Sequence, residues 1–273
     1  MSQSPLISAS ELHGLFEMGR GPVVLDIRWT LQNGSDRAGY EAGHIPTAQF
    51  VDLGTELAAP PDDRGRHPLP DADTFVAAMR GAGVGDDSAV VVYDAGPATA
   101  AARAWWLLRY FGHRDVRVLD GGFARWVDEG YSVGTEPSIV AAGSFTARPP
   151  LARVLEVGDV LAFARENVLL DARALERFRG EVEPVDPVAG HIPGAVNRPT
   201  TDNVDCDGRF LPPEVLDGAF GGLVPKGKDV AVYCGSGVTA AHQILALELA
   251  GIDAALYPGS WSGWITDPTR PRA

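Results

Sequence analysis

The chain has 273 residues, of which 45% are hydrophobic and 22% are charged, a composition typical of a folded globular protein. Its net charge of −13 at pH 7 repels phosphate backbones and anionic lipid, so we expect neither nucleic-acid nor membrane partners. There is no apolar run of about 18 residues, and the N-terminus lacks the pattern of a signal peptide. We therefore expect a soluble, cytoplasmic protein.

Strand and helix patterns alternate along the chain, which is typical of an α/β fold. Buried strands of a mostly parallel sheet are predicted at 23–27, 90–93, 116–119, 168–171, 230–233 and 254–257. Helices are predicted at 8–18, 72–81, 98–111, 123–129, 153–165, 213–220, 239–250 and 260–265. Asp71 is a predicted N-cap, and Gly112 and Gly251 are predicted at helix C-caps.

Four segments of the first half recur in the second half in the same order. The pairs are 23–29 with 168–174, 42–48 with 189–195, 89–112 with 229–251, and 118–126 with 256–264. Repeated segments in a constant order indicate a tandem duplication. We predict an N-terminal domain over 1–134, a linker rich in Gly, Pro and Ser over 135–150, and a C-terminal domain over 151–273.

The segment YCGSGVTAA (233–241) places Cys234 between a predicted strand and a predicted helix. Ligands of open α/β sheets bind at this end of the strands. Gly235 and Gly237 allow successive N–H groups to turn inward and form an anion nest, which favours a thiolate. The alternative is a buried, inert cysteine. The matching segment YDAGPATAA has Asp94 instead, so we predict that the first domain is catalytically silent.

The cysteine count limits the other kinds of site. Cys206 and Cys234 are too few for a disulfide framework, and no histidines stand at zinc-ligand spacing, so we expect no metal. Cys206 lies in a polar stretch, where it is either an ordinary loop cysteine or a protective disulfide partner of Cys234.

The paired GHIP motifs, the YCGSGVTA loop, the LDGG and PGSW segments and the tandem halves resemble the rhodanese-type sulfurtransferases over nearly the whole chain. The resemblance implies two tandem rhodanese-like domains, each a mostly parallel sheet flanked by helices. It also implies that Cys234 takes a sulfane sulfur from a small anionic donor as a persulfide. The sulfur then passes to a small thiol, cyanide or a thioredoxin-like protein, and no other cofactor is implied.

The loop chemistry separates the members of this family. Cys-Gly-Ser-Gly-Val-Thr (234–239) resembles the members that use 3-mercaptopyruvate, whereas thiosulfate-preferring members carry Arg and Lys in the loop. A neutral loop is poorly suited to a doubly charged donor. Thiosulfate sulfurtransferase remains an alternative, as does a non-catalytic module that binds an anion or a peptide. Phosphatases of this fold need a Cys-x5-Arg loop, and Ala240 stands at the arginine position.

The resemblance assigns substrate binding to the loop residues Gly235, Gly237, Val238 and Thr239 and to arginines of ERFRG (176–180). Arg177 matches a carboxylate-binding arginine and Arg179 is a second candidate, since a guanidinium holds a carboxylate through two hydrogen bonds. The alternative for each is a solvated loop arginine. A further arginine that such members have before the second GHIP is replaced here by Val185-Asp186-Pro187.

Ser236 and His67, in RHPLP, match the serine and histidine of a proton relay found in some members. Gly54 stands at the position of the acid, which leaves Asp52, Glu56, Asp62 or Asp63 as substitutes, and we assign none. His44 and His191 open the two GHIP motifs. Because the silent half also carries the motif, we predict that both histidines belong to structural turns.

Overall fold

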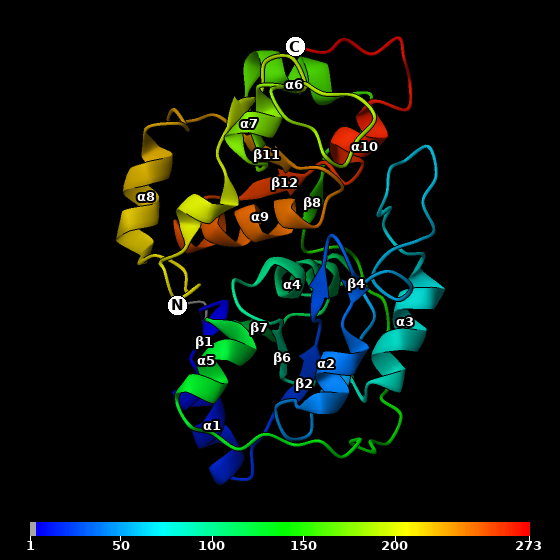
Figure 1. Cartoon of the computed structure of the whole chain (residues 1–273), viewed down its shortest axis with the longest axis vertical. Helices are drawn as coiled ribbons and strands as arrows, with labels where there is room; N and C mark the ends of the chain where they lie inside the picture. The colour runs from blue at the N-terminus through cyan, green and yellow to red at the C-terminus, as the bar shows by residue number, and fades with distance from the viewer. Residues whose placement is uncertain (1–3) are drawn as a thin grey trace. The chain divides into compact units, whose positions relative to one another are not determined.

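The computed structural model describes residues 4–273 and divides into two compact units (Figure 1). Unit 1 contains the chain up to Ala59, Pro70–Ala152 and Cys206–Phe210, and unit 2 contains Pro60–Leu69, Arg153–Asp205 and Leu211–Ala273. Each unit therefore includes one short segment from the other half of the sequence. Within residues 4–273 the structure has no helix of the length and apolarity that a membrane span requires.

Unit 1 is built on a five-stranded parallel sheet in the order β1-β7-β6-β2-β5. Its strands are β1 (Leu6–Ile7), β2 (Val23–Asp26), β5 (Gln49–Phe50), β6 (Val90–Tyr93) and β7 (Val116–Leu119). Its helices are α1 (Ala9–Glu17), α2 (Arg37–Ala42), α3 (Ala72–Gly81), α4 (Thr99–Tyr110) and α5 (Gly122–Asp128). A short antiparallel pair, β3 (Trp29–Thr30) and β4 (Gly34–Ser35), follows β2.

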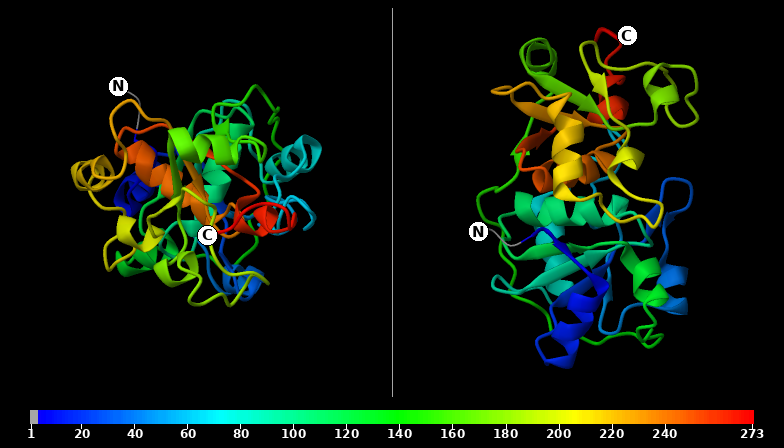
Figure 2. Two further views of the ribbon diagram at one scale, coloured as in Figure 1. Left: turned by 90° about the horizontal axis from the view of Figure 1, so that it is seen from above. Right: turned by 90° about the vertical axis from the view of Figure 1, so that its left-hand side faces the viewer.

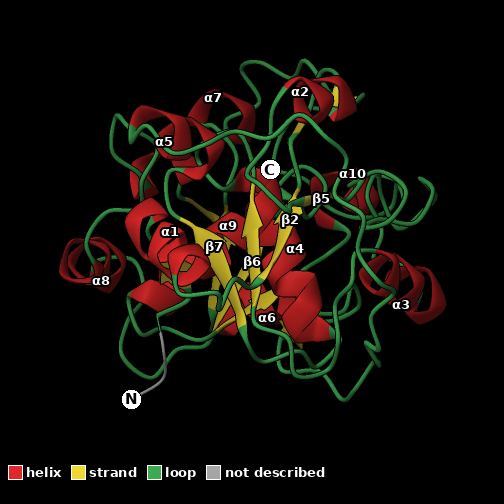
Figure 3. Cartoon of the chain, turned by 90° about the horizontal axis from the view of Figure 1, so that it is seen from below, coloured by secondary structure: helices red, strands yellow, loops and turns green. Residues whose placement is uncertain are grey.

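Both faces of this sheet are covered, which explains why its central strands are apolar at consecutive positions. Val24 and Val91 point to the face where Leu12 of α1 and Trp126 of α5 complete a buried cluster. On the other face, α4 packs against β6 and β7. In Figure 3 the strands β2, β6 and β7 run side by side among these helices.

Unit 2 repeats the plan with a parallel sheet in the order β10-β9-β11-β12-β8 (Figure 2). Its strands are β8 (Arg153–Val154), β9 (Val168–Asp171), β10 (Val196–Asn197), β11 (Val230–Tyr233) and β12 (Ala254–Leu256). Its helices are α6 (Val160–Glu166), α7 (Leu175–Phe178), the 3-10 helix η1 (Thr200–Asn203), α8 (Pro213–Gly221), α9 (Thr239–Leu249) and α10 (Ser260–Trp264). Helix α9 packs on β11 and β12, and α6 and α10 supply residues to the core of the opposite face.

The predicted α/β fold with two mostly parallel sheets is confirmed, and one predicted helix is wrong in its first part. Residues 153–154 form β8 and pair with β12, and α6 begins only at Val160. An edge strand of two residues is too short to show a period in the sequence. The Asp71 N-cap is confirmed, because its carboxylate accepts the Thr74 N–H at 2.8 Å.

The GHIP motif joins each sheet through a buried network of hydrogen bonds. In unit 1, Arg28 binds Asp26 at 2.7 Å and donates to the Gly43 carbonyl at 2.7 Å. The Tyr93 hydroxyl donates to Asp26 at 2.6 Å and accepts the Ile45 N–H at 3.2 Å. Unit 2 repeats these contacts with Arg173, Asp171, Gly190, Tyr233 and Ile192. The motif thus fixes a turn in both units.

Candidate active site

Cys234 directly follows β11, and the loop 235–238 connects it to α9. The start of α10 fixes its main chain: the Cys234 N–H donates to the Ser260 hydroxyl at 3.1 Å, and the Cys234 carbonyl accepts the Trp261 N–H at 2.9 Å. The whole stretch from Cys234 to Val238 is buried, and Thr239 is half-buried. The thiol therefore sits at the carboxyl end of a central strand, in a fixed position.

The loop turns a main-chain N–H toward the sulfur. Gly237 has φ +81°, a conformation that favours glycine, and its N–H donates to Cys234 Sγ at 3.2 Å. This donor lies just ahead of the first turn of α9, where the helix dipole also favours negative charge. The geometry is suited to a thiolate or to a negatively charged sulfur adduct.

The segment 60–69, which belongs to unit 2, packs tightly on α10 and appears as the cyan loop beside it in Figure 1. A Cβ atom on Gly65, whose φ is +126°, would lie 2.9 Å from the Gly259 carbonyl oxygen. The Arg66 N–H donates to the Ser262 hydroxyl at 3.1 Å, and Thr266 donates to the Asp63 carbonyl at 2.8 Å. This close fit places the side chains of Arg66 and His67 beside the Cys234 loop.

His67 and Ser236 are brought together as predicted for a relay, with 2.8 Å between Nδ1 and Oγ. No acid is assigned to this pair. Of the carboxylates considered, Asp62 binds the Arg64 guanidinium at 2.7 Å and Glu56 accepts a main-chain N–H at 2.6 Å.

Arg177 lies over the cysteine loop, with Nη1 and Nη2 at 3.7 and 3.8 Å from the position of a Cβ on Gly235. Its Nε and Nη2 donate to the Glu183 carboxylate at 3.2 and 2.7 Å, and Nη2 also donates to Asp186 at 3.0 Å. Burial opposes the ionised form of Glu183, but Arg177 and the main-chain N–H groups of 185 and 186 hold the pKa of that carboxyl below its usual range.

Arg179 ends α7 at the surface, where its side chain is 57% exposed and pairs with Glu181 at 3.8 Å. The contacts seen across residues 4–273 do not link it to the Cys234 loop. Its role in substrate binding therefore stays a prediction.

Two residues near the Cys234 loop, Arg66 and Asp186, were not assigned a role from the sequence. Arg66 forms an ion pair with Asp186 through Nη1, and its Nη2 lies 3.0 Å from the position of a Cβ on Gly235. Arg66 immediately precedes His67 in RHPLP, but no spacing rule connects it to a loop 169 residues away. Asp186 lies in the stretch before the second GHIP where a further arginine was expected. That observation did not predict its ion pair with Arg66.

The corresponding loop of unit 1, between β6 and α4, holds Asp94. Its buried carboxylate accepts four main-chain N–H groups, those of Gly96, Ala98, Ala100 and Ala101, at 2.8–3.2 Å. Burial raises the pKa of Asp94, and the four N–H groups act in the opposite direction. An acidic side chain of the loop itself thus occupies its anion nest.

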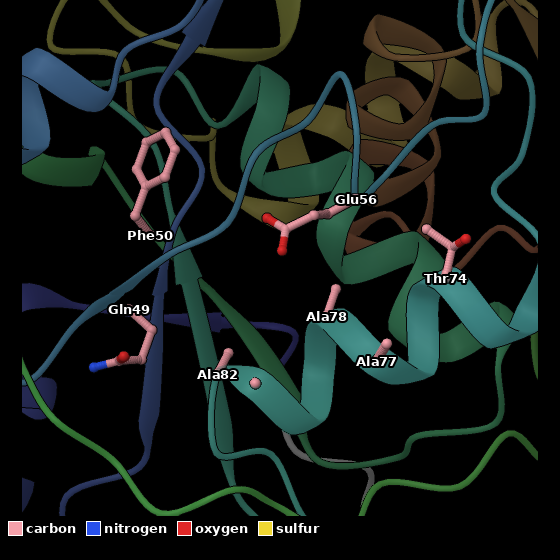
Figure 4. A pocket seen from close by; sticks show the side chains of 8 residues that line it. Gln49, Phe50, Glu56, Thr74, Ala77, Ala78 and Ala82 are labelled. Atoms are coloured by element: carbon pink, nitrogen blue, oxygen red, sulfur yellow. The ribbon is translucent and has the colours of Figure 1, made fainter.

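A pocket of about 560 Å³ opens elsewhere in unit 1 (Figure 4). It lies between β5, the Glu56 side chain and α3, and Glu56 is one of the acids considered for the His67–Ser236 pair. Its lining residues are Gln49, Phe50, Glu56, Thr74, Ala77, Ala78, Gly81 and Ala82. Burial raises the pKa of Glu56.

Known proteins similar to this chain agree with the duplicated domain. The family model for the rhodanese-like domain matches twice, over residues 8–129 and 157–267. The "Probable 3-mercaptopyruvate sulfurtransferase" of Pseudomonas aeruginosa is 46% identical, with 100% of this chain and 99% of that protein covered. The "Putative thiosulfate sulfurtransferase SseB" of Mycobacterium tuberculosis is 44% identical, with 97% and 95% covered.

Among solved structures, SseA from Escherichia coli, a 3-mercaptopyruvate sulfotransferase, has a TM-score of 0.82 and 35% identity. The match covers 95% of this chain and 100% of SseA. The resemblance inferred from the motifs is thereby confirmed. The chain belongs to the rhodanese family and carries two rhodanese-like domains.

Proposed function

We propose that this chain is a sulfurtransferase that moves a sulfane sulfur from 3-mercaptopyruvate to a thiol or cyanide through a persulfide on Cys234. The observation that carries the proposal is the buried Cys234 loop, in which the Gly237 N–H reaches the sulfur and the His67–Ser236 pair lies beside it. Unit 1 takes no part in the chemistry in this proposal, because Asp94 fills the corresponding loop.

The transfer has two steps. The Cys234 thiolate attacks the donor sulfur, an S–S bond forms, and the donor C–S bond breaks with its electron pair left on carbon. The resulting pyruvate enolate takes a proton from the Ser236 hydroxyl. His67, as a general acid–base group, can then give a proton back to Ser236. An acceptor thiolate or cyanide then attacks the outer sulfur, which leaves as an acceptor persulfide or thiocyanate and regenerates the Cys234 thiolate.

Charge near the loop supports 3-mercaptopyruvate over thiosulfate as the donor. Two guanidinium groups, Arg66 and Arg177, lie over Gly235, and two carboxylates, Glu183 and Asp186, are paired with them. These charges cancel, so the surroundings lack the excess positive charge that a dianion needs. A donor with one carboxylate fits this balance better.

The direct test is the intact mass of the protein after incubation with 3-mercaptopyruvate. We expect a gain of one sulfur atom in wild type and in Cys206→Ser, whose cysteine is exposed, and no gain in Cys234→Ser. A wild-type protein that gains no sulfur from any donor would instead support a non-catalytic binding module. If kcat/KM strongly favours thiosulfate, the choice of donor is wrong.

A further inference from the structure

Arg66 presents an unused pair of donors beside the Cys234 loop. Its Nη1 is paired with Asp186, while its Nε is buried without a hydrogen-bond partner among residues 4–273. Its Nη2, on the same edge as Nε, lies 3.0 Å from the position of a Cβ on Gly235. Nε and Nη2 together form the edge of a guanidinium that binds a carboxylate through two parallel hydrogen bonds.

Three arginines that pair with buried carboxylates show how this edge binds such a group. Arg28 gives Nε and Nη2 to Asp26 at 3.0 and 2.7 Å, and Arg173 gives the same atoms to Asp171 at 3.1 and 2.7 Å. Arg177 uses this edge for Glu183. Among residues 4–273, Arg66 is therefore the guanidinium over Gly235 whose two-donor edge has no carboxylate.

Asp186 holds Arg66 and Arg177 next to each other. Its carboxylate is almost fully buried and binds Nη1 of Arg66 through one oxygen and Nη2 of Arg177 through the other. The main chain of Arg66 is anchored as well, by its N–H bond to Ser262. A side chain held in this way loses less conformational entropy when it binds a ligand.

We propose that Arg66 binds the carboxylate of the sulfur donor through Nε and Nη2, and that Asp186 is the positioning residue that aims it. The ligand class is a small monocarboxylate whose sulfur-bearing end remains over the Cys234 loop. This inference rests on the proposed function and adds to it the residue that recognises the donor. Arg177, whose edge is filled by Glu183, contributes positive charge and its Nη1.

The experiment compares two donors that differ only at the carboxylate: 3-mercaptopyruvate and mercaptoacetone, which has a methyl group there. In Arg66→Gln we expect kcat/KM for 3-mercaptopyruvate to fall about 10- to 100-fold, mostly through KM, since charge-assisted hydrogen bonds are lost. The rate with mercaptoacetone should change less than about twofold. Arg66→Lys should recover little, because an ammonium lacks the two parallel donors.

The matched control is Arg64→Gln, which removes an equal charge from the same turn at a side chain that is 62% exposed. Arg64→Gln should leave kcat/KM unchanged for both donors. The inference would be overturned if kcat/KM for 3-mercaptopyruvate fell as far in Arg64→Gln as in Arg66→Gln. It would also be overturned if Arg66→Gln lowered kcat/KM equally for both donors, or for neither. Should Arg66→Gln fail to fold by circular dichroism, Arg66→Lys, which keeps the charge beside Asp186, decides by the same donor comparison.

A binding measurement separates this inference from the proposed function. Titration of pyruvate into Cys234→Ser should show a dissociation constant that rises about 10-fold or more when Arg66→Gln is added. If wild type takes no sulfur from any donor but pyruvate binding still depends on Arg66, the proposed function fails and the carboxylate site stands. If sulfur transfer occurs but the dissociation constant of pyruvate does not depend on Arg66, the proposed function stands and the carboxylate site at Arg66 is refuted.

Discussion

The loops after β6 and β11 share the same turn pattern and differ in what occupies their anion nests. In unit 1 the Asp94 carboxylate accepts four N–H groups, and in unit 2 the Cys234 sulfur accepts the Gly237 N–H. Both loops bring backbone donors to one point at the start of a helix. A carboxylate fills that point permanently, whereas a cysteine there can gain and lose a sulfur atom.

The segments packed against the two loops also differ. In unit 1, Gly208 lies near Pro97, with 3.6 Å from its Cβ position to the Pro97 main chain, and the residues 95–97 stay at least partly exposed. In unit 2, Arg66 and His67 reach the loop and residues 235–237 are buried. A reactive loop therefore differs from its silent copy in its covering segment as well as in the cysteine.

Giving the second loop the side chain of the first should produce the largest effect. In Cys234→Asp we expect pyruvate release from 3-mercaptopyruvate to fall by more than about 1000-fold, because the nucleophile is gone. We expect the fold to persist, since the nest then holds a carboxylate as in unit 1. Steady-state rates and far-ultraviolet circular dichroism measure both. Residual turnover near the wild-type level would refute the assignment of Cys234.

The reciprocal change, Asp94→Cys in a Cys234→Ser background, should not create activity. It removes an acceptor from four buried N–H groups, which should lower the free energy of unfolding by about 2–4 kcal/mol. A sulfur adduct at position 94 would show that the covering segment is dispensable, and the comparison of the two loops would then reduce to one residue.

Much of this fold could be predicted because its signals are local. The central strands, such as 90–93 and 230–233, are apolar at every position, and the duplication shows each pattern twice. The two-residue edge strands β1, β5, β8 and β10 could not be predicted, because their partners in the sheet define them. The exchange of segments 60–69 and 206–210 between the units also depends on contacts that no local pattern encodes.

The relay should have a smaller effect than the nucleophile. In His67→Ala we expect kcat to fall about 100-fold with little change in KM, because a general acid–base group acts mainly on the transition state. Ser236→Ala should give a similar loss, and the double variant should be no worse than either single one, since the two atoms form one hydrogen bond of 2.8 Å. Unchanged turnover in His67→Ala would rule out the relay.

The candidate site could be predicted where a motif carries it and not where packing does. Cys234 and Ser236 lie within one loop, and His67 was found through the resemblance. Arg66 and Asp186 escaped because their importance arises from an ion pair across 120 residues of sequence. Arg179 lies in the same motif as Arg177 but has its side chain at the surface, and its role in substrate binding stays a prediction.

The smallest expected effect concerns two carboxylates, one in each unit, whose pKa values move in opposite directions. Arg177 and two N–H groups overcome burial and lower the pKa of Glu183, so its stabilising contribution is present above the ordinary pKa of Glu and is lost as pH falls through the folded value. Burial raises the pKa of Asp94, so its contribution is full below the ordinary pKa of Asp and is lost as pH rises through the folded value.

Unfolding by urea between about pH 7 and about pH 3 should therefore give opposite trends for the two variants. The stability of wild type relative to Glu183→Gln should be about 1–3 kcal/mol at neutral pH and shrink as the pH falls below the ordinary pKa of Glu, because the unfolded chain then takes up a proton that the folded carboxylate does not yet bind. The stability of wild type relative to Asp94→Asn should instead grow as the pH is lowered. If both stability differences instead changed in the same direction with pH, the two units would stabilise a buried carboxylate in the same way. The contrast between the Asp94 loop and the Cys234 loop would then have no electrostatic cause.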